Sequence, residues 1–269
     1  MKKKITGFLL LCALLAVPTF AHDLFLKLDN FFVAVNSKVK ISILNGSFTE
    51  SEGAVTFTRL KDVSFVSPKG ERANLTETDL TKNETTSFLS FEPKESGTYV
   101  VGLSTMTREI DLDGKDFNEY LKHDGIPDTL AERKKKKELD KKVRERYSKH
   151  VKTIFQAGEA QTENYKTVLG YPVELVPQQN PYKLKAGDTI EILCLKDGKP
   201  LAGQYVMSGR ESAGKIVAES NVRTDKKGIA KIKLNSAGKW YVRFINMTRL
   251  ADPKLNYESK WGTLTFELK

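Results

Sequence analysis

The feature of this chain that most restricts its fold is a succession of short apolar runs, each bounded by turn-forming residues. In residues 39–43 (VKISI) the apolar side chains alternate with polar ones, which is typical of a strand buried on one face. Such runs recur about every ten residues, and this spacing favours a β-sandwich or a β-barrel. In the amino-terminal half they lie at residues 31–35, 39–43, 55–60, 63–66, 88–91 and 97–103.

A second β unit is predicted after residue 182, where Asp197-Gly198 and Asp225-Lys226-Lys227-Gly228 mark turns between strands. Seven short strands in about 88 residues fit an immunoglobulin-like or transthyretin-like sandwich. We therefore expect a mainly β chain with two such sandwich units, at residues 22–113 and 165–269. A helical insertion and a linker, residues 114–164, would separate them.

Two helices are expected in the insertion. Asp116 and Glu119 form a capping-box pattern at the start of a short helix, which Gly125-Ile126-Pro127 ends. Asp128 can cap a second, longer helix. Along this helix apolar residues follow at spacings of four, four, four and three, which is typical of one helical stripe. This apolar stripe consists of Leu139, Val143, Tyr147, Val151 and Ile154.

Positive charge is concentrated in residues 132–146, which hold nine Lys or Arg against four Asp or Glu. Such a run can bind nucleic acid or anionic lipid. No aromatic residues alternate with the lysines to stack on bases, so nucleic acid is not expected as a partner. The simpler interpretation is a solvated helix face with Glu–Lys pairs along it.

The first 21 residues have the pattern of an export signal. Three lysines precede an apolar stretch at residues 8–17, and Thr19 and Ala21 are the small residues before a cut. Cleavage after Ala21 would leave a periplasmic or secreted chain of about 248 residues. No later segment reaches about 18 apolar residues, so no transmembrane segment is expected in the mature chain. Only Cys194 then remains, which excludes a disulfide within the chain and suggests a buried structural thiol.

Cleavage after Ala21 makes His22 the first residue. Its free α-amine and its imidazole can then close a chelate ring on one metal ion, which an internal histidine cannot do. Nitrogen-rich tetragonal coordination favours Cu(II) or Ni(II). His123 and His150 are the only other histidines that could complete the site, and Asp23 could add an oxygen ligand or orient the site. Each also has a plain structural interpretation: His150 as a partly buried helix residue, and His123 as a surface histidine stabilised at a helix C-terminus.

Catalytic patterns are scarce. The chain has no Gly-x-Ser-x-Gly, His-Glu-x-x-His or phosphate-loop motif, and Cys194 lies in an apolar strand. An amino-terminal histidine on a β-sandwich also begins copper oxygenases that cleave polysaccharides, but the surrounding sequence does not resemble those enzymes. We therefore expect no enzymatic activity.

Several segments resemble a periplasmic family of unknown function, whose members are described as nickel-uptake-associated, NikM-like periplasmic components. The similar stretches are AHDLFLKL after the signal, RERYSKHVKTIFQAG in the centre, and LKDGKPLAG, TDKKGIAKI, SAGKWYVRF and YESKWGTLTFEL towards the end. The resemblance implies an exported two-part β protein linked to nickel or cobalt uptake, with His22 at the family's Ala-His-Asp start. A membrane uptake transporter would be its partner. The alternative is a structural or protein-interaction module without a metal site.

Overall fold

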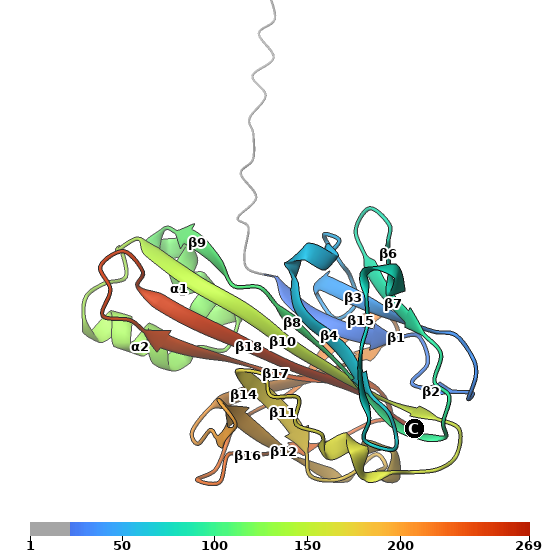
Figure 1. Cartoon of the computed structure of the whole chain (residues 1–269). Helices are drawn as coiled ribbons and strands as arrows, with labels where there is room; N and C mark the ends of the chain where they lie inside the picture. Colours follow the sequence, from blue (N-terminus) through green and yellow to red (C-terminus); the bar gives the residue numbers. More distant parts are fainter. Residues whose placement is uncertain (1–21) are drawn as a thin grey trace, which may run out of the picture.

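A ten-stranded sheet forms the middle layer of the protein in the computed structural model, which describes residues 22–269 (Figure 1). The predicted signal peptide lies outside the described residues. Along this middle sheet the order is β15-β14-β17-β18-β10-β8-β4-β5, and β2 and β9 also pair with β10. Its strands are β2 (Phe32–Val33), β4 (Leu60–Val66), β5 (Arg72–Asn74), β8 (Gly97–Thr105), β9 (Arg108–Leu112), β10 (Val143–Ala157), β14 (Tyr205–Ser212), β15 (Lys215–Arg223), β17 (Gly238–Arg249) and β18 (Tyr257–Leu268).

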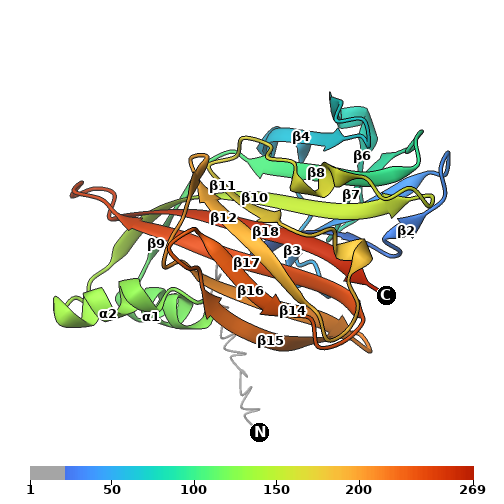
Figure 2. The ribbon, with the colours of Figure 1, turned by 90° about the horizontal axis from the view of Figure 1, so that it is seen from below.

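Two smaller sheets cover the two faces of the middle sheet (Figures 1 and 2). The first has the order β1-β3-β7-β6, and in the second β11, β12 and β13 follow one another while β16 pairs with β12. The first consists of β1 (Asp23–Leu28), β3 (Val39–Gly46), β6 (Leu80–Lys82) and β7 (Ser87–Phe91). The second consists of β11 (Val173–Pro177), β12 (Thr189–Lys196), β13 (Lys199–Pro200) and β16 (Ile229–Lys233).

Within residues 22–269, the helices α1 (Gly114–His123) and α2 (Pro127–Lys135) lie beside the first small sheet, on the same face of the middle sheet. Their apolar side chains pack against Trp261 of β18 and Ile245 of β17. Short 3-10 turns occur at Phe57–Arg59, Glu77–Asp79, Glu163–Lys166 and Pro181–Lys183.

The alternation of side chains along the middle sheet separates two hydrophobic cores. On β8 and β10, Tyr99 and Phe155 pack with β1 and β3, whereas the adjacent Val100 and Ile154 pack with β11 and β12. We call these the β1 face and the β12 face of the middle sheet. The prediction of a mainly β protein with sandwiched sheets is confirmed. The limits of its predicted units stay a prediction, and the middle sheet takes strands from both β units and from the segment between them.

The predicted long helix with the stripe from Leu139 to Ile154 is wrong. Helix α2 ends at Lys135, and residues 143–157 form the 15-residue strand β10. A spacing of four residues also keeps Val143, Tyr147 and Val151 on one face of a strand, because four is a multiple of the strand period of two. Pairing with β18 on one side and with β8 and β9 on the other satisfies the strand's backbone groups.

Helix α1 exists where a short helix was predicted, but its start differs. It begins at Gly114 after Asp113, and Asp116 lies inside its first turn, so the predicted capping box does not form its start. The end follows the prediction, since Gly125 adopts the left-handed conformation with φ +74°. The predicted hairpin at Asp197-Gly198 also forms, with both residues at positive φ.

Candidate amino-terminal metal site

His22 lies at the surface immediately before β1, and contacts on both its main chain and its ring hold it in place. Lys149 of β10 donates a hydrogen bond from Nζ to the carbonyl oxygen of His22. The ring atom Nε2 lies 3.3 Å from Oε2 of Glu52, and the His22 side chain is 35% exposed. Glu52 therefore faces the ring nitrogen that is farther from the main chain. In a chain that begins at His22, Nδ1 and the α-nitrogen would be the pair that closes a chelate ring.

Asp23 belongs to a buried ion-pair network rather than to an open ligand position. Its Oδ2 lies 2.9 Å from Nη1 of Arg243 on β17, and Nη2 of the same arginine lies 3.2 Å from Oδ1 of Asp124. Burial and the nearby Asp124 raise the pKa of Asp23, while the Arg243 guanidinium opposes this shift. The Arg243 guanidinium therefore forms an ion pair with the carboxylate that was expected to bind the metal ion or to orient its site.

His123 ends α1 and joins the same network through the next residue. Its Nδ1 lies 3.3 Å from Oδ1 of Asp124, and its side chain is 85% exposed. The hydrogen bond to Asp124 raises the pKa of His123. Contacts thus run from Asp23 through Arg243 and Asp124 to His123, across the seam between β1 and α1.

Two further ionisable side chains of β10 lie buried next to this network. Burial lowers the pKa of Lys149 to about 8, against the opposing effect of Asp23. Burial raises the pKa of Glu145 to about 7, although Ser259 and Tyr120 both donate hydrogen bonds to its carboxylate. The seam therefore contains buried acidic and basic groups, which lie on the surrounding strands and beside α1.

His150 lies on the other face of the middle sheet. Ser104 Oγ is 2.9 Å from its Nδ1, and Ser148 Oγ is 2.9 Å from its Nε2. Burial lowers the pKa of His150 to about 4, and the cations of Lys260 and Lys61 lower it further. A neutral ring with one donor and one acceptor nitrogen has both positions engaged by these serines.

The structure thus links Asp23 and His123 through Arg243 and Asp124, while His22 contacts Glu52 and Lys149, and His150 lies apart on the other face of the middle sheet. Within residues 22–269, no group of three or more His, Cys, Asp and Glu side chains is arranged to hold a metal ion. The donors at this position are the nitrogens of His22, because the Glu52 carboxylate faces Nε2 and not the chelating Nδ1. The nitrogens of His22 fit a metal ion that the protein coordinates on one side only. The remaining coordination positions would be open to water or to a partner.

Sequence reasoning missed Glu52 and Arg243. Glu52 lies in the loop after β3 and belongs to no periodic pattern, so nothing in the sequence marks it. Arg243 does carry a signal, because it interrupts the apolar strand WYVRFI, and buried arginines are nearly always paired. The prediction for Cys194 is confirmed, since its side chain is fully buried and burial raises its pKa.

Comparisons with solved structures gave matches of low similarity. The D0-D1 domain of intimin matches with 13% identity and a TM-score of 0.20 over 91% of this chain and 97% of that chain. The two tandem V-type regions of VCBP3, a v-region-containing chitin binding protein, match with 7% identity and a TM-score of 0.21 over 90% and 99%. Trypsin-activated α2-macroglobulin from Escherichia coli matches with 8% identity and a TM-score of 0.25 over 93% of this chain and 16% of that one. At these TM-scores the matches carry no argument about function.

Other comparisons concern the sequence itself. No curated protein matches the chain. None of the helices in the described part of the chain is long and apolar enough to cross a membrane. Residues 19–248 match the family described as "Domain of unknown function (DUF4198)". Because this match covers most of the sequence, the chain belongs to the DUF4198 family.

Proposed function

We propose that the mature protein is an exported, non-enzymatic protein that binds a divalent transition metal through the α-amine and imidazole of His22. The observation that supports this most directly is the placement of His22 at an accessible surface, with its carbonyl oxygen held by Lys149 and its ring beside Glu52. A residue held at both main chain and side chain is preorganised, which reduces the entropy lost when a ligand binds. The ion would be passed on to a membrane uptake transporter.

The donor set determines which metals suit the site. The amine and Nδ1 of His22 provide two nitrogens, and Glu52 can accept a hydrogen bond from Nε2–H and so orient the ring. Nitrogen ligands in a tetragonal arrangement favour Cu(II), whereas the family resemblance favours Ni(II) or Co(II). His150 takes no part in this proposal, because its ring lies across the middle sheet with both nitrogens engaged. Open coordination positions suit a protein that releases its ion to a partner.

A structural or protein-interaction module remains the second candidate, and one observation favours it. Strand β15 has nine residues and forms an outer edge of the middle sheet, where among the described residues only β14 pairs with it. Such an edge can accept a further strand from another protein.

Metal titration of the mature protein separates the two candidates. The amino terminus is first determined by mass spectrometry, and Cu(II), Ni(II) and Co(II) are then titrated by calorimetry. We expect His22→Ala, and a variant with one alanine added before His22, each to weaken binding at least about tenfold. Glu52→Gln should weaken binding less, and Glu50→Gln, an exposed acid two residues away, is its matched control.

The outcomes are distinct. If His22→Ala and the extended variant both bind each metal as the wild type does, the metal proposal is wrong and the interaction module becomes the better candidate. His123→Ala tests the other histidine on the β1 face: unchanged binding leaves His22 as the donor residue, and weaker binding adds His123 to it.

A further inference from the structure

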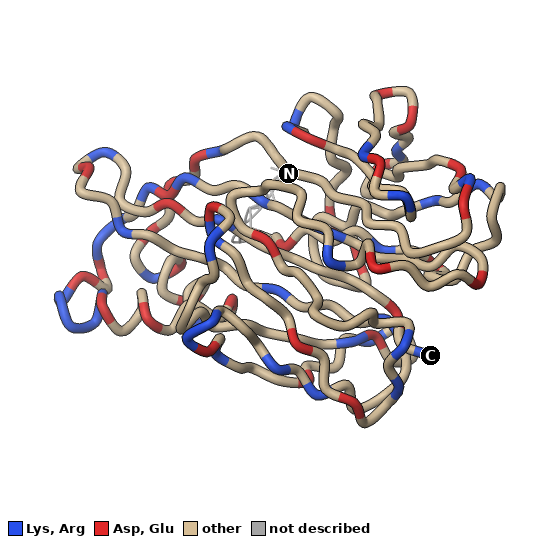
Figure 3. The backbone as a smooth tube through the Cα atoms, turned by 60° about the horizontal axis from the view of Figure 1, so that its bottom comes forward, with Lys and Arg blue, Asp and Glu red and all other residues tan. Residues whose placement is uncertain are grey.

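A strongly basic turn is formed by the last residues of α2 and the two that follow, at one end of the molecule (Figure 3). Residues 132–142 carry seven cationic and three acidic side chains. Lys134, Lys135 and Lys137 are exposed, and within residues 22–269 no carboxylate forms an ion pair with any of the three. We call residues 134–137 the basic turn.

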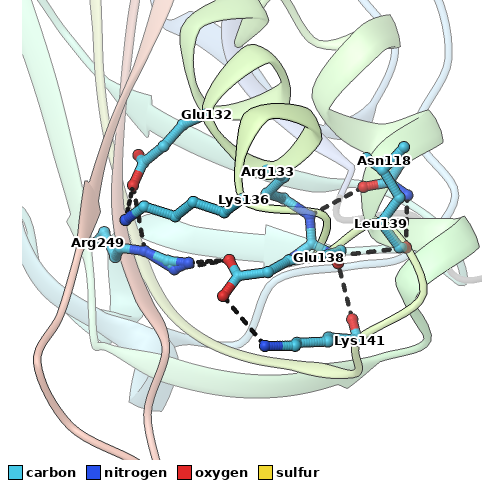
Figure 4. Close-up of polar contacts among 8 residues, drawn as sticks. All are labelled: Asn118, Glu132, Arg133, Lys136, Glu138, Leu139, Lys141 and Arg249. Atoms are coloured by element: carbon cyan, nitrogen blue, oxygen red, sulfur yellow. Dashed lines mark hydrogen bonds and ion pairs between the residues drawn. The ribbon is translucent and has the colours of Figure 1, made fainter.

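The buried Arg133 holds the basic turn in one conformation (Figure 4). Its Nε donates to Oδ1 of Asn118 at 2.9 Å, and its Nη2 donates to the carbonyl oxygens of Glu138 at 2.7 Å and Lys141 at 3.1 Å. Its guanidinium also lies 5.0 Å from the ring centroid of Phe117 on α1. The turn is therefore fixed against the rest of the protein rather than free to collapse onto nearby acids.

Two of the three acidic side chains of the same segment, Glu132 and Glu138, point to partners inside the molecule (Figure 4). Glu138 pairs with Arg249 of β17 and, at 3.3 Å, with Lys141. Glu132 lies 2.6 Å from Lys136 and 3.3 Å from Arg249. These pairs engage Glu132 and Glu138 within the protein, and the unpaired lysines face solvent.

The backbone of the basic turn shows a further feature. Lys137 has φ 57°, and the amides of Lys137 and Glu138 donate to the carbonyl oxygens of Lys134 at 3.1 Å and Arg133 at 3.0 Å. This is the Schellman pattern, in which the left-handed position is usually glycine because a side chain there is strained. A lysine at this position adds a charge to the turn despite that strain.

We propose that the basic turn docks the protein on an anionic lipid surface. The partner surface must be negatively charged, and each lysine close to such a membrane adds to the attraction. The turn carries no exposed large apolar side chain, since the large apolar side chains that are exposed in the described residues are Met106, Val168 and Ile216. Recognition of acidic motifs in proteins commonly uses clusters of arginines, whereas the exposed cations of the basic turn are lysines, which act as point charges towards an anionic lipid surface. Docking is thus electrostatic, without insertion, and does not depend on metal binding.

Vesicle co-sedimentation of the metal-free mature protein tests this proposal. The vesicles contain either phosphatidylcholine alone or a mixture with phosphatidylglycerol, at low and at high salt. The wild type should bind only the mixed vesicles and should be released by salt. The variant Lys134→Gln/Lys135→Gln/Lys137→Gln should bind at least about tenfold more weakly. The matched control, Lys215→Gln/Lys226→Gln/Lys227→Gln, removes three exposed and unpaired lysines elsewhere and should bind nearly as the wild type does.

Three outcomes would overturn the proposal. The first is failure of the wild type to bind vesicles that contain phosphatidylglycerol. The second is equal loss of binding in the two triple variants, which would show that net charge and not the basic turn is responsible. The third is binding to soluble polyglutamate but not to the vesicles, which would favour an acidic polypeptide. Thermal unfolding followed by circular dichroism checks that each variant is folded. The variant Lys137→Gly removes one of the three charges without straining the backbone, because glycine readily adopts the left-handed conformation of this position.

Discussion

His150 should make the protein less stable at acidic pH. In the folded protein its ring is buried between Ser104 and Ser148, and burial lowers its pKa to about 4, with Lys260 and Lys61 lowering it further. In the unfolded chain a histidine has a pKa of about 6.5. Between these two values the unfolded state binds a proton that the folded state does not, so acidification favours unfolding.

The size of the effect follows from the two pKa values. The contribution of a neutral His150 to stability is fully present above about pH 6.5 and is lost as the pH falls towards 4. From about pH 7 to about pH 4.5 the loss amounts to about 2.5 kcal/mol in the free energy of unfolding. Other groups also titrate in this interval, among them Glu145, so the test must isolate the histidine.

Urea denaturation of the wild type and of His150→Asn at both pH values provides this comparison. Asparagine can still hydrogen-bond the two serines but does not titrate, so the variant should lose about 2.5 kcal/mol less than the wild type on acidification. His123→Asn is the control of opposite sign. The hydrogen bond to Asp124 raises the pKa of His123, so its contribution is present below about pH 6.5 and is lost as the pH rises through the folded-state pKa. Equal pH dependence in the wild type and in His150→Asn would refute the reasoning.

Three further predictions concern single side chains. Arg243→Met removes the cation between Asp23 and Asp124, so the free energy of unfolding measured in urea should fall by about 3–5 kcal/mol, and adding Asp23→Asn should restore part of it; an unchanged midpoint would contradict the buried ion-pair network. Lys137→Gly relieves a left-handed side chain and should raise the free energy of unfolding by about 0.5–1 kcal/mol, whereas Lys137→Ala should change it by less than about 0.5 kcal/mol. The Cys194 thiol, buried and with a raised pKa, should react with a thiol reagent only after unfolding in urea, and rapid reaction of the native protein would show that β12 is accessible.

Most of the β structure could be predicted from local patterns. The alternation in residues 39–43 lies within β3, where every second side chain is buried, and the run at residues 97–103 lies within β8, which is buried along its whole length. Turn residues were equally informative, as the hairpin at Asp197-Gly198 shows. What these patterns could not show is that strands from three separate stretches of the chain join in one middle sheet. This depends on pairings such as that of β10 with β18, which lie more than a hundred residues apart in the sequence.

The candidate site could be predicted only in its first part. His22 and Asp23 follow from the cleavage pattern, but the surroundings that position them come from distant segments. Glu52 comes from the loop after β3, and Lys149 comes from β10. No local pattern connects these residues with His22, because the contacts form only when β1 packs on the middle sheet.

Whether residues 143–157 form a helix or a strand also decides which other histidine could bind the same metal ion as His22. On a helix, His150 would lie next to the apolar stripe as a partly buried residue, and it was a candidate second ligand only because the chain has few histidines. On a strand, adjacent residues point to opposite faces, so Lys149 and His150 cannot both face β1. The hydrogen bond from Lys149 to the carbonyl oxygen of His22 places the odd-numbered residues of β10 on the β1 face, and the serine contacts of His150 place the even-numbered ones on the β12 face. Any second protein ligand for a metal at His22 must therefore come from the β1 face, where Glu52 lies beside the His22 ring and His123 ends the ion-pair network.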